Sequence, residues 1–280
     1  MGHETVSEAE EILDKEYEVL DKGFIRLVDY MGGDARIVQA ARVSYGKGTK
    51  TKREDRGLIN YLMRNQHTSP FEQVILTFHC KMPLFVARQW VRHRTARLNE
   101  ISGRYSVMEN EFYVPDTNQI RYQSKDNKQG RNQEDEVPIE LQQKVLDIIK
   151  KGHQRSYEEY QKMLDENIAR ELSRINLPLS LYTQWYWQID LHNLFHFLKL
   201  RMDEHAQWEI RQYAKVMSEM TQKVAPMAFE AFEKHVLNSF DFSGKEAEAL
   251  SKILKGETPD LSGSAKTDFE KKIQRLKNYS

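Results

Sequence analysis

Cysteine is nearly absent from this chain of 280 residues, and a single thiol excludes an intramolecular disulfide and fits a reducing compartment. No stretch approaches the roughly 20 consecutive apolar residues that cross a bilayer, so we expect no membrane partner. Residues 1–11 are acidic and lack the apolar core of a secretion signal, which favours a cytoplasmic location. The chain also lacks Gly-x-Gly-x-x-Gly after a strand and Gly-x-x-x-x-Gly-Lys. Any nucleotide must therefore bind without a Rossmann turn or a P-loop.

Net charge is absent as well, because 42 lysines and arginines balance 42 aspartates and glutamates. Such a chain is a poor candidate for a general nucleic-acid surface, and we expect no nucleic-acid partner. Against this neutral background, residues 88–97 contain four arginines, one histidine and no acid. Guanidinium groups bind phosphate and carboxylate in a bidentate manner, so this basic run predicts a local anion site.

The basic run includes Arg92-His93-Arg94, and seven residues later the chain reads Ser102-Gly103-Arg104-Tyr105-Ser106. Three further blocks lie at residues 67–72 (HTSPFE), 174–179 (RINLPL) and 200–210 (LRMDEHAQWEI). Together the blocks resemble, in order, the signature of flavin-dependent thymidylate synthases, and the resemblance extends from about residue 22 to about residue 235. A lone Arg-His-Arg would carry little weight, whereas four ordered blocks favour membership of the family.

The resemblance implies a reductive methylation of dUMP to dTMP, with FAD as cofactor, methylenetetrahydrofolate as carbon donor, NADPH as reductant and no metal. It also implies a mixed α/β (α+β) fold, in which one domain has a small central sheet flanked by long helices. A homotetramer with active sites between subunits is implied too. We expect this domain at residues 22–240, after an N-terminal helical extension at 1–21 and before a charged C-terminal tail at 241–280.

The residues that the resemblance assigns to dUMP are Gln89, Trp90, Val91, Arg92, Glu100, Ile101, Ser102, Gly103, Arg104, Arg174 and Arg201. Arg201 is the main catalytic candidate, because a guanidinium beside the uracil stabilises negative charge on the ring and activates it toward attack at C6. Ser102 and His67 complete the catalytic candidates. Considered without its flanking block, Arg201 would instead be expected in a helix salt bridge with Glu204 or His205.

The residues that the resemblance assigns to FAD are Ser44, Ser69, Glu72, Arg92, His93, Arg94, Glu100, Asp190, Leu191, His192 and His196. Family members often carry Asn at position 190, and they vary at positions 192 and 196. An ionised Asp190 can only accept hydrogen bonds, which puts the flavin contacts at these three positions in doubt. His67 is as compatible with a structural role at a helix end as with a place near the flavin or folate.

Cys80 is informative because the other class of thymidylate synthase attacks the uracil with a cysteine. Here the only thiol alternates with Val74, Leu76 and Phe78, a pattern typical of the buried face of a strand. Ser102 has no histidine and aspartate close in sequence to activate it. We therefore expect reduced flavin, rather than a protein nucleophile, to supply the chemistry.

Two other functions remain open from the residues alone. A metal-dependent helical enzyme could use His192 and His196, four residues apart, with Asp190, Asp203 and His205 as further ligands. The His-Glu-x-x-His pattern is missing, which disfavours this alternative. A nucleic-acid-binding module could combine the basic run with Tyr105, Tyr113 and Tyr122, but the neutral net charge disfavours it.

Alternation of apolar residues predicts strands at residues 24–30 and 73–81 and a short strand at 112–114. The expected helices are 7–20, 34–44, 53–65, 83–93, 139–166, 167–173, 179–198, 203–223 and 226–237. The first of them would start with a capping box at Ser7-Glu8-Ala9-Glu10. On the helix at 179–198, Tyr182, Trp185, Tyr186 and Trp187 are expected in the core. Residues 116–136 are polar and indicate either a plain linker or a lid over the substrate, and the tail at 244–280 should be helical with breaks at 256–259 and 262–264.

Overall fold

The computed structural model of the chain describes residues 4–43, 52–125, 129–132 and 135–278. Ser44, one of the expected flavin contacts, lies outside the described residues. Two compact units make up the chain, Met1–Phe232 and Glu233–Ser280. The residues of the expected site all belong to the first unit.

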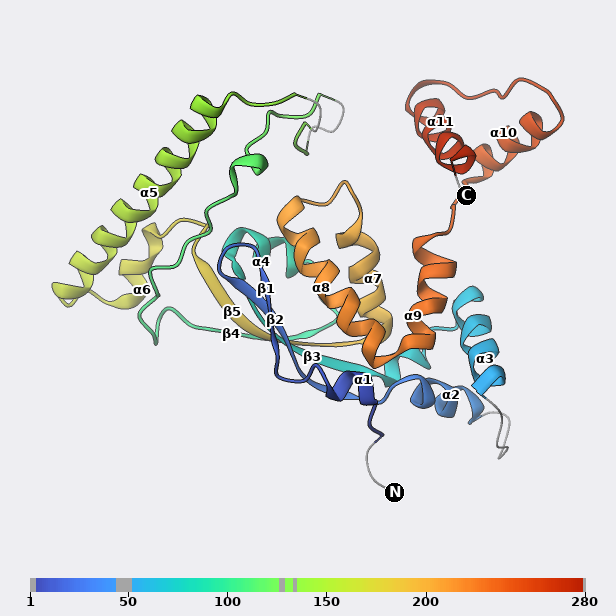
Figure 1. Ribbon diagram of the computed structural model, residues 1–280, viewed down its shortest axis with the longest axis horizontal. Coiled ribbons are helices and arrows are strands. Elements are labelled where there is room, and N and C mark those ends of the chain that lie inside the picture. Colours follow the sequence, from blue (N-terminus) through green and yellow to red (C-terminus); the bar gives the residue numbers. More distant parts are fainter. Residues whose placement is uncertain (1–3, 44–51, 126–128, 133–134, 279–280) are drawn as a thin grey trace. The chain divides into compact units, whose positions relative to one another are not determined.

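A five-stranded antiparallel sheet in the order β1-β2-β3-β5-β4 forms the centre of the first unit (Figure 1). The strands are β1 (Glu16–Val19), β2 (Gly23–Met31), β3 (Ile75–Pro83), β4 (Arg97–Glu100) and β5 (Tyr182–Asp190). The expectations of strands at 24–30 and 73–81 are confirmed. With the helices around it, this sheet also confirms the mixed α/β fold class.

Strand β3 is the middle of the sheet. It pairs with β5 along its whole length, from Ile75↔Asp190 to Pro83↔Tyr182, and with β2 on its other side. Alternate side chains of a strand point to opposite faces. On β3 the fully buried side chains are those of Leu76, Phe78, Cys80 and Met82. The expected burial of the only thiol is therefore confirmed.

The helices of the first unit are α1 (Ser7–Glu10), α2 (Asp34–Arg42), α3 (Lys52–Arg64), α4 (Leu84–Trp90), α5 (Ile139–Asp165), α6 (Arg170–Ser173), α7 (Leu191–Met202), α8 (Trp208–Val224) and α9 (Pro226–Phe232). Helices α7 and α8 lie side by side, and α9 lies against α3 (Figure 1). Helix α8 also contacts β1 and β2. Its Tyr213 hydroxyl donates a hydrogen bond of 2.9 Å to the carbonyl of Lys81 at the end of β3. This contact fixes α8 against the central strand.

An aromatic cluster fills the core between α4 and β5. Trp90 is fully buried, and its ring lies edge-on to Trp185 at 5.5 Å and to Trp187 at 5.3 Å. Phe197 and Tyr213 complete the contacts of the Trp90 ring. Such aromatic pairs contribute about 0.5–1.5 kcal/mol each beyond simple burial. The cluster holds the last residue of α4 rigidly, immediately before the Arg-His-Arg motif.

The expected helix at 179–198 is wrong in its first half, because Tyr182–Asp190 is strand β5. Trp185 and Trp187 alternate with the exposed Tyr186, and β-favouring aromatic residues suit a half-buried strand. Helix α7 begins only after Asp190, whose carboxylate accepts a hydrogen bond of 3.0 Å from the Asn193 backbone N–H. The burial expected for Tyr182 and the two tryptophans is confirmed, although on a strand, whereas the burial expected for Tyr186 is wrong, because its side chain is exposed.

The N-terminal segment also differs from the expectation. Helix α1 ends at Glu10, and no side chain of its N-cap forms a hydrogen bond, so the helix expected through Leu20 and its capping box are both wrong. Residues 16–19 instead form β1, whose Glu16 is paired with Arg26 of β2. Positive φ values at Asp14 (57°) and Leu20 (62°) turn the chain on either side of this strand. The strand expected at 112–114 is only an isolated bridge between Phe112 and Leu181.

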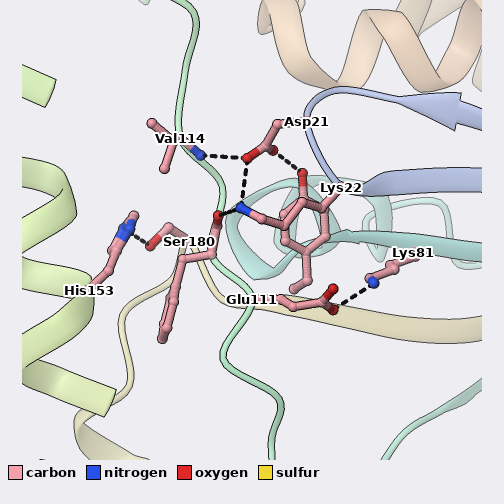
Figure 2. Close-up of polar contacts among 9 residues, drawn as sticks. Asp21, Lys22, Lys81, Glu111, Val114, His153 and Ser180 are labelled. Carbon is pink, nitrogen blue, oxygen red and sulfur yellow. Dashed lines mark hydrogen bonds and ion pairs between the residues drawn. The ribbon is translucent and has the colours of Figure 1, made fainter. Parts of the chain in front are cut away.

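A polar network attaches the segment around Phe112 to the sheet (Figure 2). The Asp21 carboxylate accepts hydrogen bonds from the Tyr182 hydroxyl at 2.6 Å and from the Val114 N–H at 3.2 Å. Lys22 Nζ donates to the Phe112 carbonyl at 2.8 Å. The β1–β2 turn thus holds the chain that leads from the Ser102 region toward residues 116–136.

The second unit contains a π-helical turn (Glu233–Leu237) followed by α10 (Gly244–Leu254) and α11 (Gly263–Lys277). Ser243 caps α10 in a capping box with Glu246. Lys272 of α11 bonds the same carboxylate at 2.7 Å, and this contact lowers the pKa of Glu246 to about 2. The expected break at 256–259 lies between the two helices, whereas the break expected at 262–264 is wrong beyond Ser262, because α11 begins at Gly263.

Candidate functional site

The Arg-His-Arg motif directly follows helix α4. The backbone N–H of His93 bonds to the Trp90 carbonyl at 3.0 Å, which continues the helical turn past the buried tryptophan. Arg92 and Arg94 are exposed, whereas His93 is half-buried. Cationic side chains at the carboxyl end of a helix are favoured by its dipole. The core therefore presents two guanidinium groups outward and one imidazole inward.

A cavity of about 360 Å³ opens beside this motif. Three elements line it: the turn after α4, the end of β5, and one face of α7. The lining residues are Arg92, His93, Arg94, Thr95, Ile189, Asn193, His196, Leu200 and Arg201. The cavity thus brings together four of the expected flavin contacts and the main catalytic candidate. Thr95, Ile189, Asn193 and Leu200 were missed in the sequence, although Asn193 lies three residues before His196 and so on the same helix face.

Arg201 is positioned by the motif itself. Its Nε donates a hydrogen bond of 3.0 Å to His93 Nε2, and its Nη2 donates to the Gln89 carbonyl at 3.4 Å. No carboxylate pairs with Arg201 among the residues that the structure describes, and His205 pairs with Asp203 instead. The salt bridge expected for an isolated Arg201 is therefore wrong. Its charge remains available to a ligand in the cavity.

His93 is neutral at physiological pH. Burial, followed by the positive charge of Arg201 and the effect of His196, lowers the pKa of His93 to about 4. Its ring also packs against Phe197 with a centroid separation of 4.9 Å. A neutral imidazole accepts the hydrogen bond of Arg201 through Nε2, whereas an imidazolium could only donate. Protonation of His93 would therefore release the guanidinium.

We expect acid to weaken the fold partly through His93, and replacing His93 with glutamine to remove this component. Between its ordinary pKa of 6.5 and about 4, the unfolded state binds the proton and the folded state does not, so stability falls as pH falls through that window. Urea unfolding of the wild type and His93→Gln at pH 7 and pH 5 measures this loss. The stability difference between the two proteins should shrink at pH 5. Equal pH dependence would contradict the neutral-imidazole assignment.

A second group of expected residues surrounds the turn at Ser102–Ser106. A Cβ atom at Gly103 would lie 2.9 Å from Met108 Sδ and 3.1 Å from Arg174 Cδ, so a larger residue would require these two side chains to move. Arg104 pairs with Glu171 at 3.1 Å. The turn and Arg174, two separate blocks of the sequence, are therefore neighbours in space, as a shared phosphate site requires.

Strand β4 separates the two groups. It lies at the edge of the sheet, with Arg97 opposite Gln188 and all four residues exposed. Ile101 N–H bonds to the Gln184 carbonyl, whereas the cavity starts at Ile189, five residues along β5. At about 3.3 Å per residue this is a separation of about 16 Å. One copy of the chain therefore presents the cavity and the Ser102 turn at opposite ends of β5.

The block at 67–72 lies next to the start of α7. The Leu191 N–H donates to the Val74 carbonyl at 2.8 Å, and the rings of Phe71 and Phe195 are in contact. Ser69 and Glu72 are exposed on this loop. The fold thus brings this block close to Asp190, Leu191 and His192, which the resemblance assigns to the same cofactor.

His67 is exposed and has a structural contact. Its backbone N–H bonds to the Leu62 carbonyl at 2.9 Å after Gln66, whose φ of 56° is typical of a helix end. Its ring lies edge-on to Tyr61. These contacts favour a helix-end role, while a place near the flavin or folate stays a prediction.

Several expected contacts can involve only the backbone or an already occupied side chain. Trp90 and Leu191 are fully buried, so a ligand could reach only their main-chain atoms. The Asp190 carboxylate accepts from both the backbone and the side chain of Asn193, at 3.0 and 2.8 Å. Glu100 accepts a hydrogen bond of 2.6 Å from Thr183. The side chain of Asp190 therefore caps the start of α7.

Two further observations concern metal binding, one of the alternatives left open by the sequence, and membrane insertion. Within the described ranges, no group of three or more histidine, cysteine, aspartate or glutamate side chains is arranged to hold a metal ion. No helix in the described part of the chain has the length and apolar character needed to span a membrane.

Comparison with known proteins gives the family. The family described as "Thymidylate synthase complementing protein" matches residues 26–227, and the "Thymidylate synthase ThyX C-terminal domain" matches residues 241–279. The chain is 62% identical to a flavin-dependent thymidylate synthase from Treponema denticola, over 94% of this chain and 98% of that protein. It is 56% identical to the one from Treponema pallidum, over 98% and 90%.

A solved structure shares the fold. The UMP/dUMP methylase PolB from Streptomyces cacaoi, bound with 5-Br dUMP, superimposes with a TM-score of 0.71 at 35% identity, covering 78% of this chain and 97% of that one. The matches include the Arg-His-Arg motif, the Ser102 turn and Arg201, all of which lie within residues 26–227. The chain therefore belongs to the family of flavin-dependent thymidylate synthases.

Proposed function

We propose that this enzyme binds FAD and dUMP and methylates the uracil at C5 to give dTMP, with methylenetetrahydrofolate as carbon donor and NADPH as reductant. One observation carries the proposal: Arg201, without a carboxylate partner among the described residues, lines the same small cavity as Arg92, His93 and Arg94. An anionic nucleotide and an electron-rich ring need such cations.

The donor set fits a flavin nucleotide. Arg92 and Arg94 have no carboxylate partner within the described parts of the chain, so both are free to bind a diphosphate, and Asn193 and His196 add neutral polar groups. The neighbouring loop with Ser69 and Glu72 would complete the site. When bound, reduced flavin supplies the one-carbon relay and the hydride.

The protein residues have separate roles in this proposal. The backbone of Ser102-Gly103 and the side chains of Arg104 and Arg174 bind the dUMP phosphate, and each charge-assisted hydrogen bond contributes about 1.5–3 kcal/mol. Arg201 stabilises negative charge on the uracil oxygens and so favours attack at C6. His93 holds Arg201 in position without competing for its charge. These roles require the Ser102 turn and the cavity to reach one substrate.

The separation of about 16 Å along β5 supports an assembly in which different copies complete each site. We therefore include in the proposal a homotetramer with active sites between subunits, located in the cytoplasm, with small molecules rather than nucleic acid as ligands. Mixing two inactive variants tests this arrangement. Co-expressed Arg201→Ala and Arg174→Ala chains should regain dTMP formation if one site takes Arg201 and Arg174 from different copies. A mixture as inactive as its components would place both residues on one copy.

We expect Cys80→Ala to keep dTMP formation close to that of the wild type. The thiol is fully buried in β3, and its burial raises its pKa far above the ordinary value, so no thiolate is available. Removing the sulfur should cost only about 1 kcal/mol of stability through a small cavity. Product analysis together with thermal unfolding distinguishes the two effects. A folded but inactive variant would show that the nucleophile is wrongly assigned.

The visible absorbance of the purified protein tests the proposal as a whole. A flavin spectrum that is bleached by NADPH, at a rate that changes with dUMP, is the expected result. Chromatography of the reaction with methylenetetrahydrofolate should then show dTMP. A colourless protein that takes up no added FAD would overturn the proposal.

A further inference from the structure

A second, larger cavity lies beyond the carboxyl end of α7. Its volume is about 1040 Å³, and its described lining residues lie within 118–125, 129–132 and 204–215, together with Asp135. From helix α8 it is lined by Trp208, Arg211, Gln212 and Lys215, which follow the spacing of one helix face. The expected site residues do not line it. It is large enough for part of a cosubstrate.

The charge of this cavity is predominantly positive. Arg121, Lys125, Arg211 and Lys215 line it, and in the described residues none of these four is ion-paired. The acidic lining residues are Asp135 and Glu204. Arg131 is also present but is neutralised by the buried Glu209. These four cations outnumber the lining acids Asp135 and Glu204 and the adjacent Asp203, whose charge interacts with Arg211, so the cavity attracts anions in a chain of zero net charge.

Arg211 gives the most direct indication of a missing partner. Its Nε is buried and has no hydrogen-bond acceptor. A buried guanidinium N–H without an acceptor is costly, and an anionic oxygen would remove that cost. The start of the 17-residue helix α8 lies at the same wall, and no side chain caps it. Its dipole adds to the attraction for negative charge.

One side chain connects this cavity to the Arg201 site. Gln207 lines the cavity and is hydrogen-bonded to Gln89, whose carbonyl accepts from Arg201. Gln207 also donates to Glu209 at 2.9 Å. A ligand that reached from the Arg201 site past Gln207 would place its far end among the four cations. The position fits an extended molecule with its reactive end at Arg201 and its charged end here.

We infer that the large cavity binds the multiply charged anionic end of a cosubstrate of the proposed reaction. This inference rests on the proposed function, and two sources share the required chemistry. One is the phosphate-bearing adenosine end of the reduced dinucleotide, and the other is the carboxylate-bearing glutamate tail of the folate. Both are flexible, extended and anionic at the end distant from the reacting group.

Two probes distinguish the sources on the full-length protein loaded with FAD and dUMP. Adenosine 2′,5′-bisphosphate represents the dinucleotide, and tetra-γ-glutamate represents the folate tail. Calorimetric titration should show one of them binding to the wild type and weakening as salt is added. In the double variant Arg211→Gln/Lys215→Gln, affinity for that probe should fall by about tenfold or more. Lys144→Gln, an exposed lysine change on α5, is the matched control and should bind like the wild type.

Steady-state kinetics distinguishes loss of cosubstrate binding from general damage to the fold, because general damage would also lower kcat and the affinity for dUMP. In the double variant, KM should rise for NADPH or for polyglutamylated methylenetetrahydrofolate, according to the probe that binds, while kcat and the affinity for dUMP stay unchanged. If neither probe binds, or if neither KM moves in an enzyme that forms dTMP, the inference is wrong and the proposed function stands. If the protein forms no dTMP, the proposed function fails, and probe binding alone decides whether this cavity is an anion site.

Discussion

Replacing Arg201 with alanine should leave the protein folded and yellow but nearly unable to form dTMP. Removing one preorganised group that stabilises developing charge typically costs about 100–1000-fold in kcat. The structure explains why retention of flavin is expected: Arg92, Arg94 and Asn193 line the cavity independently of Arg201. Single-turnover formation of dTMP, with flavin absorbance measured on the same sample, checks both parts of the prediction.

Two controls make the Arg201 result specific. Arg155→Ala removes an exposed guanidinium on α5, whose partner is Glu159, and should have wild-type kinetics. Arg201→Lys keeps the charge but cannot maintain both hydrogen bonds to His93 and Gln89, so it should recover only part of the activity. Normal turnover by Arg201→Ala would remove Arg201 from the mechanism.

Replacing Glu209 with alanine should strongly destabilise the first unit. Glu209 is 1% exposed and accepts hydrogen bonds from Tyr113 at 3.2 Å and Gln207 at 2.9 Å, and it pairs with Arg131. Its removal leaves the buried Tyr113 hydroxyl and Arg131, which is 29% exposed, without their shared acceptor, and costs about 3 kcal/mol. Chemical denaturation measures the free energy of unfolding. Glu219→Ala, an exposed change on the same helix, is the matched control and should be nearly neutral.

The contacts of Glu209 also connect helix α4 to the polar segment that contains Arg131. Glu209 connects Gln207, and through it Gln89 of α4, to Arg131 in the polar segment at 116–136. An isosteric Glu209→Gln change keeps the shape but removes the charge that holds Arg131. It should therefore loosen this segment more than it unfolds the protein, which hydrogen exchange can measure. A Glu209→Ala variant within about 1 kcal/mol of the wild type would contradict the stabilising role of the buried Glu209 carboxylate.

Regular alternation made the central strands predictable, because Val74 to Cys80 switch between core and partly exposed positions at every residue. Strand β4 could not be predicted in the same way, since all four of its residues are exposed and no alternation exists to detect. In β5 the dense aromatic run was compatible with a buried helix as well as a strand. Only its pairing with β3, more than a hundred residues earlier, decides between them.

The candidate site likewise depends on long-range contacts that local sequence patterns do not predict. The sequence blocks predicted functional roles for Arg92, His93, Arg94 and Arg201, and the fold brings these four residues to one cavity. The hydrogen bond between His93 and Arg201 joins residues 108 positions apart, and no local pattern contains such a contact. The sequence also did not reveal that the seven residues between Arg94 and Ser102 contain the edge strand β4. Sequence blocks thus predicted the candidate residues, whereas long-range packing determines the protonation of His93 and the orientation of Arg201.

The exposed edge strand β4 also bears on the solubility of the isolated subunit. Unpaired backbone groups at a sheet edge can recruit another strand without limit, which is how aggregates grow. Here the edge is only four residues long and begins and ends with the charged residues Arg97 and Glu100. A short edge with a charge at each end resists indiscriminate pairing. The strand that separates the two halves of the site is thereby also protected against fibrous association.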